Sequence, residues 1–536
     1  MSKRSTTKAR TPASKTNGSR AARPPAPRAQ PAPRRQAGRQ AAPRAERARS
    51  WLGLRAALRR IPRAAWVCAL VAVLNAACWS ILTPPFQVPD EPNHFAYVKQ
   101  LALTGHLPKP GVGPEFSNEE VRVIDALHAY EIREQQENRT ITTRSQQNAL
   151  QRALQEGEPS SERAPVSTGV AASQPPLYYA LEAVPYSLGG NLLDRLELMR
   201  LFSALLGGLT ALFVFLFVRE ALPGAPWAWT VGGLSIALFP LLGFMSGAVN
   251  PDAMLFAVSA AMFYCLARAF QRGLTAGMAV ALGALTLIGL ATKLNFIGLV
   301  PGVFLGILIL GVRAGRSHGR AGYRSLGIAL AVAGSPVAVY AAIRLASHRS
   351  AFGIVSSGVA LTHGSLLKEL AYIWQLYLPR VPGMSNYFHG VFTARQIWFD
   401  GFVGLYGWLD TPFPAWVETL ALIPAALIAI LSIRAIVSSR AALRARLAEL
   451  AVYVVMGVGL LGLIGADSYL VFPTLNAEFG QVRYLLPLLP LLGAVLVLAA
   501  RGAGRRWGPV AGALVVVLFL AHDIFSQLQV LARFYG

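Results

Sequence analysis

Eleven apolar runs alternate with polar segments along this chain of 536 residues. A helix rises about 1.5 Å per residue, so about 20 apolar residues cross a hydrocarbon core of roughly 30 Å. We interpret the runs as candidate membrane spans. They lie at residues 65–83, 198–218, 227–245, 253–267, 275–291, 294–312, 325–346, 415–436, 449–466, 484–500 and 507–527. The pattern predicts an all-α polytopic membrane protein with about 11 transmembrane helices. The number rises to 12 or 13 if the amphipathic stretch 175–188 enters the membrane as a hairpin instead of lying at its surface.

Composition and charge divide the chain into two parts. With 54% hydrophobic and 14% charged residues, the chain has too little charge for an ordinary soluble surface. Of the net charge of +24, residues 1–65 supply +17, from 18 Lys/Arg against one acid. Residues 1–64 are rich in Arg, Ala and Pro and cannot bury a core, so we predict a disordered arm. Its charge favours a cytoplasmic location and contact with anionic lipids rather than specific nucleic-acid binding.

The three cysteines, Cys68, Cys78 and Cys265, all lie within apolar runs. They predict neither a disulfide framework nor a thiolate metal site. The first span has no clear cleavage site after it and is expected to remain as an anchor. The membrane domain is therefore expected to cover residues 65–530.

Basic residues predict the topology. With the N-terminus inside, alternate connections carry arginines, as the positive-inside rule requires. These arginines are Arg219, Arg268, Arg272, Arg313, Arg316, Arg320, Arg324, Arg434, Arg440, Arg444, Arg446, Arg501, Arg505 and Arg506. The connections assigned outside include two long loops. The first, 84–196, has 14 acids and 9 bases, and the second, 347–414, is rich in aromatic residues. These aromatic residues suit an interfacial belt or a platform for sugars.

Asp90, Glu91 and His94 follow directly on the first span, where fixed ionisable groups are costly and often functional. The alternative is that Asp90 only caps a helix from Glu91 to about Thr104. On one helical face, Glu91 and His94 offer ligands for a divalent cation, and the simpler alternative is a carboxylate–histidine pair without metal.

Further candidate residues begin or end other apolar runs on the same predicted side. Asp252 follows Asn250 and Pro251 in a sequence that also suits a plain helix start. Lys293 either binds an anionic lipid phosphate or snorkels to the interface. Arg483 lies on the outer side against the charge rule, which favours clamping of a phosphate or carboxylate. Substrate-binding candidates on this side are His94, Tyr178, Lys293, Asp410, Arg483 and Tyr484.

Five features together resemble the GT-C superfamily of membrane glycosyltransferases and, within it, the bacterial DUF2142 family of predicted membrane proteins. They are the acidic pair Asp90-Glu91, the Pro-Pro-Leu-Tyr-Tyr segment at 175–179, Arg200, the Asn-Pro-Asp segment at 250–252 and Arg-Tyr-Leu-Leu-Pro at 483–487. The resemblance implies a GT-C-like bundle, a polyprenyl-phosphate-linked sugar as donor and a bacterial plasma-membrane location. It also implies Asp90 as the catalytic base, Glu91 as its neighbour or a metal ligand, and Asp252 as a second acid.

On this basis we expect a glycosyltransferase that acts on an extracytoplasmic glycan, lipid or protein acceptor. No Trp-Trp-Asp triplet is present, which argues against peptide asparagine as acceptor. A transporter or flippase for a lipid-linked glycan would need charged groups near the bilayer midplane, where the apolar runs have almost none. A noncatalytic scaffold subunit is the third hypothesis.

Overall fold

The computed structural model describes residues 60–135, 137–141, 143–157, 166–346, 366–390, 393–475 and 480–536. The chain divides into two units, Met1–Arg60 and Ile61–Gly536. Nearly all of the predicted basic arm therefore lies outside the described residues. The second unit is helical apart from one short hairpin of β1 (Leu405–Tyr406) and β2 (Thr411–Pro412).

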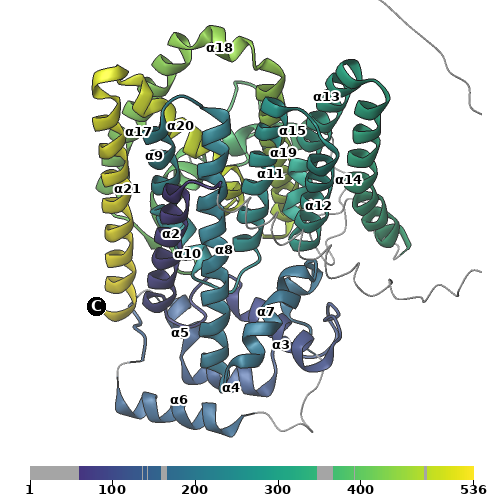
Figure 1. Ribbon diagram of the computed structural model, residues 1–536. Helices are drawn as coiled ribbons and strands as arrows, with labels where there is room; N and C mark the ends of the chain where they lie inside the picture. The colour runs from purple at the N-terminus through teal and green to yellow at the C-terminus, as the bar shows by residue number, and fades with distance from the viewer. Residues whose placement is uncertain are drawn as a thin grey trace, which may run out of the picture. The chain divides into compact units, whose positions relative to one another are not determined.

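Long apolar helices form a bundle in this unit (Figure 1). They are α2 (Arg63–Leu82), α8 (Leu192–Ala221), α11 (Asp252–Arg272), α13 (Val300–His318), α14 (Arg320–Ala346), α17 (Ala415–Ser438), α19 (Leu447–Leu475), α20 (Leu489–Gly502) and α21 (Gly504–Tyr535). Two short 3-10 segments, η3 (Leu294–Leu299) and η5 (Val482–Leu488), lead into α13 and α20. Within the described residues, nine helical segments are long and apolar enough to cross a membrane. The predicted all-α polytopic membrane protein is confirmed.

The two remaining predicted spans differ from straight crossings. Residues 227–245 form α9 (Pro226–Ala237) and α10 (Pro240–Ser246), bent by 54° at Pro240. The bend follows from proline, which lacks the amide hydrogen that would continue the helix. Residues 275–291 form α12 (Ala276–Thr292), which at 17 residues is shorter than the nine. The described part of the chain thus contains nine to ten candidate spans rather than the predicted eleven.

Short helices lie beyond one end of the bundle, which we call the Asp90 end. They are α3 (Glu91–Thr104), α4 (Asn118–Ala126), α5 (Ala129–Glu134), α6 (Arg144–Glu156), η2 (Gly169–Ser173) and α7 (Leu177–Leu188). Figure 1 shows α18 (Arg440–Arg444) at the opposite end. The stretch 175–188 contributes the single helix α7, which packs on α3 and α8. Its 12 residues span about 18 Å, too short for a membrane crossing or a hairpin.

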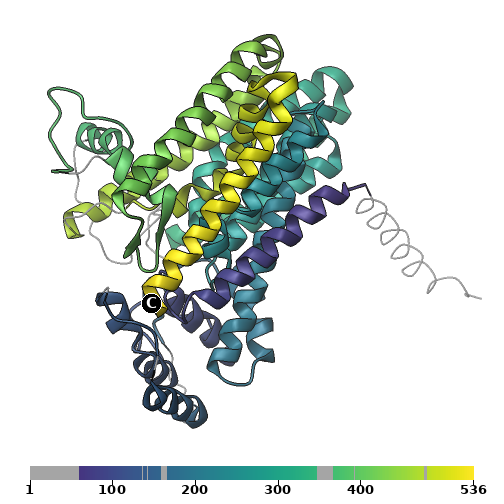
Figure 2. The ribbon, with the colours of Figure 1, turned by 90° about the vertical axis from the view of Figure 1, so that its left-hand side faces the viewer.

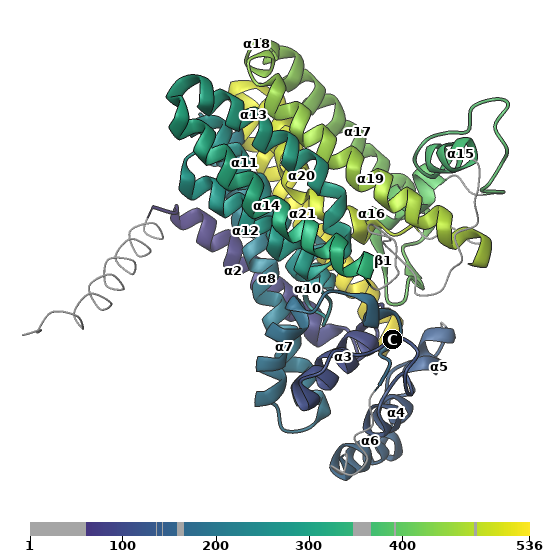
Figure 3. The ribbon, with the colours of Figure 1, turned by 90° about the vertical axis from the view of Figure 1, so that its right-hand side faces the viewer.

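The second loop region also lies toward the Asp90 end. It contains α15 (Leu366–Tyr377), the π-helical turn η4 (Ala394–Asp400), α16 (Gly401–Gly404) and the β1–β2 hairpin. Figure 3 shows α15 to one side of the bundle, next to α19. Figure 2 shows α21 running along the bundle, with its C-terminal end beside the helices of the first loop. The core of the bundle is formed by α8, which packs against α2, α9 and α11.

Candidate functional site

Asp90 lies at the turn between α2 and α3 and forms an ion pair with a residue distant in sequence. Its Oδ2 is 2.7 Å from Nη2 of Arg483, at the start of η5. The predicted helix Glu91–Thr104 is confirmed, but Asp90 makes no side-chain cap hydrogen bond to it. Its backbone is left-handed, with φ 66°, whereas a capping residue is usually extended. The capping hypothesis for Asp90 is therefore wrong, and its carboxylate stays 29% exposed beside Arg483.

A second ion pair joins the start of α11 to the end of α12. Nζ of Lys293 lies 2.6 Å from Oδ1 of Asp252, and both side chains are buried. The Asp252 amide donates to Oδ1 of Asn250 at 3.0 Å, so the predicted helix start at this sequence is present. The second Asp252 oxygen, Oδ2, is buried without a hydrogen-bond partner. Lys293 therefore points into the protein, and the snorkelling alternative is wrong.

Arg483 and Tyr484 bring the two ion pairs together. The Tyr484 ring lies 5.2 Å from the Arg483 guanidinium carbon and 5.7 Å from Lys293 Nζ. The carbonyl of Pro89 accepts from Asn250 Nδ2 at 3.4 Å and from Arg483 Nη1 at 3.5 Å. Nε of Arg483 is buried and has no hydrogen-bond partner. Helix starts and ends from four separate stretches of sequence thus meet in one charged cluster at the Asp90 end.

His94 completes this cluster as a neutral side chain. Its Nδ1 lies 2.9 Å from the Tyr179 hydroxyl, and only 4% of the residue is exposed. Burial lowers the pKa of His94 to about 3, although the charge of Asp90 opposes the shift. For Asp90, burial raises the pKa, but the cations around it, Arg483 first among them, outweigh burial and keep the pKa below its ordinary value. At neutral pH the cluster therefore contains an ionised Asp90 and an uncharged imidazole.

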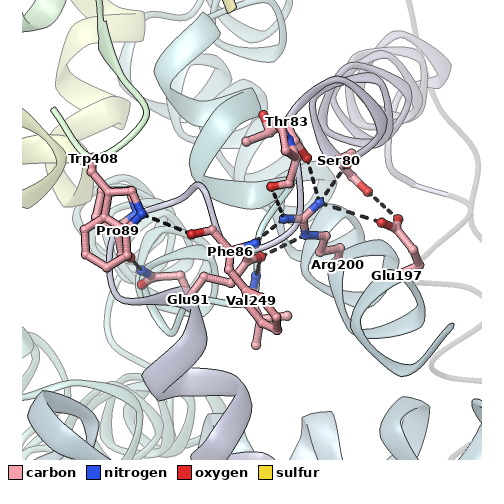
Figure 4. A network of polar contacts seen from close by, with 11 residues as sticks. Ser80, Thr83, Phe86, Pro89, Glu91, Glu197, Arg200, Val249 and Trp408 are labelled. Atoms are coloured by element: carbon pink, nitrogen blue, oxygen red, sulfur yellow. Dashed lines mark hydrogen bonds and ion pairs between the residues drawn. The ribbon is translucent and has the colours of Figure 1, made fainter. Parts of the chain in front are cut away.

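Glu91 has a different role from its neighbour, as Figure 4 shows. Its Oε1 and Oε2 accept from Arg200 Nε at 2.8 Å and Nη2 at 2.6 Å. The backbone amides of Phe86 and Val249 donate to the same carboxylate at 3.0 and 3.1 Å. Arg200 also donates to the carbonyls of Ser80 and Thr83, each at 2.9 Å. Glu91 is thus the buried acid of an ion pair that fixes the turn carrying Asp90.

The proposed metal site at Glu91 and His94 is not supported by this arrangement. Arg200 and two amides occupy both Glu91 oxygens, and His94 binds Tyr179. Among the residues that the structure describes, no group of three His, Cys, Asp or Glu side chains is placed to hold a metal ion.

Two other predicted binding residues have partners of their own. The Tyr178 hydroxyl bonds to Ser203 Oγ at 2.8 Å, which in turn donates to Glu182 at 2.8 Å. Asp410 forms an ion pair with Arg533 at 2.9 Å and so connects the hairpin turn to α21. The tyrosine beside the cluster is Tyr179, whereas the sequence prediction selected its neighbour Tyr178 from the Pro-Pro-Leu-Tyr-Tyr segment. Two adjacent tyrosines on a short helix face different directions, and only the packing of α7 on α3 decides which one meets His94.

A cavity of about 620 Å³ begins at this cluster. Pro89 and Arg483 form its wall at the Asp90 side. The remaining wall comes from α10, η4, α16, the β-hairpin, the first turn of α17 and residues 480–482 at the start of η5. Its apolar lining includes Leu241, Phe244, Met245, Ile397, Leu405, Leu409, Phe413 and Val482, and its polar lining includes Gln396, Asp400, Glu418 and Gln481. Arg483 is therefore the member of the charged cluster that lines this largely apolar cavity.

Fold and site define a multi-pass helical membrane protein with a charged cavity at one end of its bundle. A family model described as a predicted membrane protein, DUF2142, matches residues 73–492. The chain belongs to this family, as the sequence resemblance predicted. No curated protein and no solved structure gives a significant match.

Proposed function

We propose that this protein is a GT-C-type glycosyltransferase of the bacterial plasma membrane. It transfers a sugar from a polyprenyl-phosphate donor to a hydroxyl group of a cell-envelope glycan, lipid or protein. The observation that carries the proposal is the pairing of a partly exposed carboxylate, Asp90, with the arginine whose buried Nε faces no partner at the wall of the cavity. An acid that accepts a proton and a cation that stabilises phosphate are the two groups that such a transfer needs.

The positive-inside rule supports placing this site on the extracytoplasmic side. The basic helix ends meet at the end of the bundle opposite Asp90. Arg272 pairs with Glu220 at 2.7 Å there, and Arg446 pairs with Glu449 at 2.7 Å. Cytoplasmic connections carry the excess of Arg and Lys, so the opposite end is the extracytoplasmic one.

In the proposed reaction, Asp90 accepts the proton of the acceptor hydroxyl. The oxygen forms a bond to the anomeric carbon, and the bond from that carbon to the phosphate oxygen breaks. The electron pair leaves with the phosphate, whose charge Arg483 stabilises, with Lys293 nearby. Asp252 holds Lys293, and Glu91 with Arg200 holds the turn of Asp90.

Arg483 couples the two halves of this chemistry. Its ion pair with Asp90 contributes to the low pKa of that carboxyl, which makes Asp90 a weak base in the absence of donor. When a phosphate binds to the same guanidinium, it partly neutralises the positive charge beside Asp90, and the pKa of Asp90 rises. Donor binding thereby activates the base.

Replacement of Asp90 by Asn is the first test. In a strain lacking the protein, the wild-type gene should restore the envelope glycan. The Asp90→Asn gene should not, because loss of the base is expected to lower the initial rate of sugar transfer by about 10² to 10⁴-fold. Asp125→Asn is the matched control, because Asp125 is an exposed acid in α4, outside the charged cluster. Glycan composition and membrane abundance of each variant are measured together.

The result also separates the enzyme from a scaffold. If the protein is an enzyme, Asp90→Asn is present at normal abundance and still binds farnesyl phosphate, but it forms product at the reduced rate given above. If this variant restores the glycan as well as the wild type, Asp90 is not the base and the proposal is wrong.

A further inference from the structure

The wall of the cavity also carries polar groups that the proposed chemistry does not use. Asp400 ends η4, Glu418 lies in the first turn of α17, and Gln481 precedes η5. All three line the same cavity as Arg483. Gln481 is distant in sequence from Asp400 and Glu418, so its convergence with them is a product of the fold.

Two of these groups have buried atoms without hydrogen bonds. Oε1 of Gln481 is buried and has no partner. Oδ1 of Asp400 lies 3.5 Å from Arg395 Nε but receives no hydrogen bond, and the Asp400 side chain is only 12% exposed. Arg395 itself donates to Thr419 Oγ1 at 2.9 Å. Leaving a buried acceptor unsatisfied costs about 1 to 3 kcal/mol, so such atoms indicate a missing donor.

The missing donor is a neutral one. Arg483 gives the cavity a cationic wall where a phosphate is favourable, whereas Asp400 and Glu418 would repel an anion. Hydroxyl groups donate well to carboxylates and to amide oxygens. Phe244, Phe413 and Leu409 contribute apolar surface to the same cavity. A sugar ring matches such a lining, because its hydroxyl groups can donate to the acceptors and the C–H groups on its faces can pack on the apolar side chains.

We propose that this cavity is a saccharide-binding subsite, in which Asp400, Glu418 and Gln481 accept hydrogen bonds from sugar hydroxyls. This inference rests on the proposed function, because it places the phosphate at Arg483 and the sugar next to it. Asp400 and Glu418 are then specificity-determining residues. Pro89 and Arg483 line the subsite, and Asp90 follows Pro89 and pairs with Arg483, so a ring in the subsite would lie near the base.

Binding to the purified full chain in nanodiscs tests the subsite. The probes are farnesyl phosphate, its mannosyl, glucosyl and ribosyl esters, and the corresponding free methyl glycosides. The wild type is expected to bind at least one glycosyl ester at least tenfold more tightly than farnesyl phosphate. Asp400→Asn and Glu418→Gln should each reduce this preference about tenfold, because a charged acceptor is lost. Asp125→Asn is the control and should keep the full preference.

Farnesyl phosphate is the internal standard for folding. Asp400→Asn and Glu418→Gln should not weaken its binding, because they remove negative charge and no group that contacts the phosphate, whereas Arg483→Gln should weaken all lipid phosphates. If Arg483→Gln does not, the proposed function fails, whatever the sugar result. If the two acid variants instead bind farnesyl phosphate at least tenfold more tightly, more than the removal of one negative charge explains, the cavity holds the lipid chain and the saccharide assignment is wrong.

The remaining outcomes concern the source of the sugar. If the acid variants weaken the esters, the ring belongs to the donor. If they weaken only the free methyl glycosides, it belongs to the acceptor, and the saccharide assignment stands in both cases. If no glycosylated probe binds better than its parent, or the variants change neither class of probe, the inference is overturned.

Discussion

Glu182 is a carboxyl group enclosed between α7 and α8, with no exposed surface. Oε1 accepts from Ser203 at 2.8 Å, and Oε2 is buried without a partner. Burial raises the pKa of Glu182 to about 8, from an ordinary value of 4.5. Between pH 4.5 and about 8, Glu182 is therefore protonated in the folded protein and ionised in the unfolded chain.

This difference in proton binding predicts a pH dependence of stability. Because the unfolded state binds fewer protons between pH 4.5 and about 8, the free energy of unfolding falls as the pH rises through this window. A shift of one pKa unit corresponds to about 1.4 kcal/mol, and the loss is expected to exceed that. Glu182→Gln removes the titration, so its melting temperature in detergent should fall less between pH 5 and 8. Equal slopes for the variant and the wild type would contradict the assignment.

The Glu91–Arg200 pair makes a second prediction at the level of single residues. Both side chains are fully buried, and removal of one partner of such a pair costs about 3 to 5 kcal/mol. Glu91→Gln and Arg200→Met should each lower the melting temperature and the membrane abundance by similar amounts. The double variant should be more stable than Arg200→Met alone, because it leaves no unpaired buried carboxylate. A Glu91→Gln protein of wild-type stability that lacks activity would instead indicate a catalytic role for Glu91.

At the level of elements, the C-terminal end of α21 connects the two loop regions at the Asp90 end. Arg533 donates to the carbonyls of Ile132 at 2.6 Å and Asn138 at 2.7 Å, and it pairs with Asp410. The Thr140 amide donates to the carbonyl of Phe534 at 2.9 Å. One helix end thereby fixes the first loop segment and the hairpin that lines the cavity.

Arg533→Met should loosen both loop segments without unfolding the bundle. The change removes several charge-assisted hydrogen bonds, each worth about 1.5 to 3 kcal/mol, so amide exchange at residues 137–141 and 405–412 should become at least tenfold faster. Exchange in α8 and α11 should stay the same. Arg505→Met, an exposed position near the other end of α21, is the control. Unchanged exchange at the hairpin in Arg533→Met would show that the loops are held by other contacts.

At the level of the whole molecule, the separation of charge between the two ends of the bundle predicts its orientation. Glu137 and Arg444 are exposed and lie in the first loop region and in α18, at opposite ends. In a cysteine-free background of intact cells, Glu137→Cys should react with a membrane-impermeable thiol reagent. Arg444→Cys should react only after permeabilisation. The reverse pattern would place Asp90 on the cytoplasmic side and would contradict the proposed extracytoplasmic transfer.

Several elements were predictable because they depend on local sequence. The first, second and fourth apolar runs lie within or largely within α2, α8 and α11, and helix Glu91–Thr104 begins and ends where Pro92 and Gly105 indicate. The bend between α9 and α10 was not predicted, although Pro240 was visible in the sequence. A proline in an apolar run permits either a kink or a break, and the packing of α10 against α2 and α8 decides the outcome.

Within the site, the sequence by itself determined which charged residues lie at helix ends on one side of the bundle. Such placement follows from local rules, since charges are excluded from apolar runs and collect at their ends. The sequence did not determine which of these charged residues form ion pairs with one another. Asp90 with Arg483, Asp252 with Lys293 and Glu91 with Arg200 are pairings over 393, 41 and 109 residues.

Only the tertiary structure decided these pairings and the roles that follow from them. It made Glu91 a fully satisfied structural acid, left Asp90 partly exposed beside Arg483, and placed Tyr179 rather than Tyr178 against His94. The physical reason is that a buried charge needs a partner within a few ångströms, and packing of helices distant in sequence sets that distance.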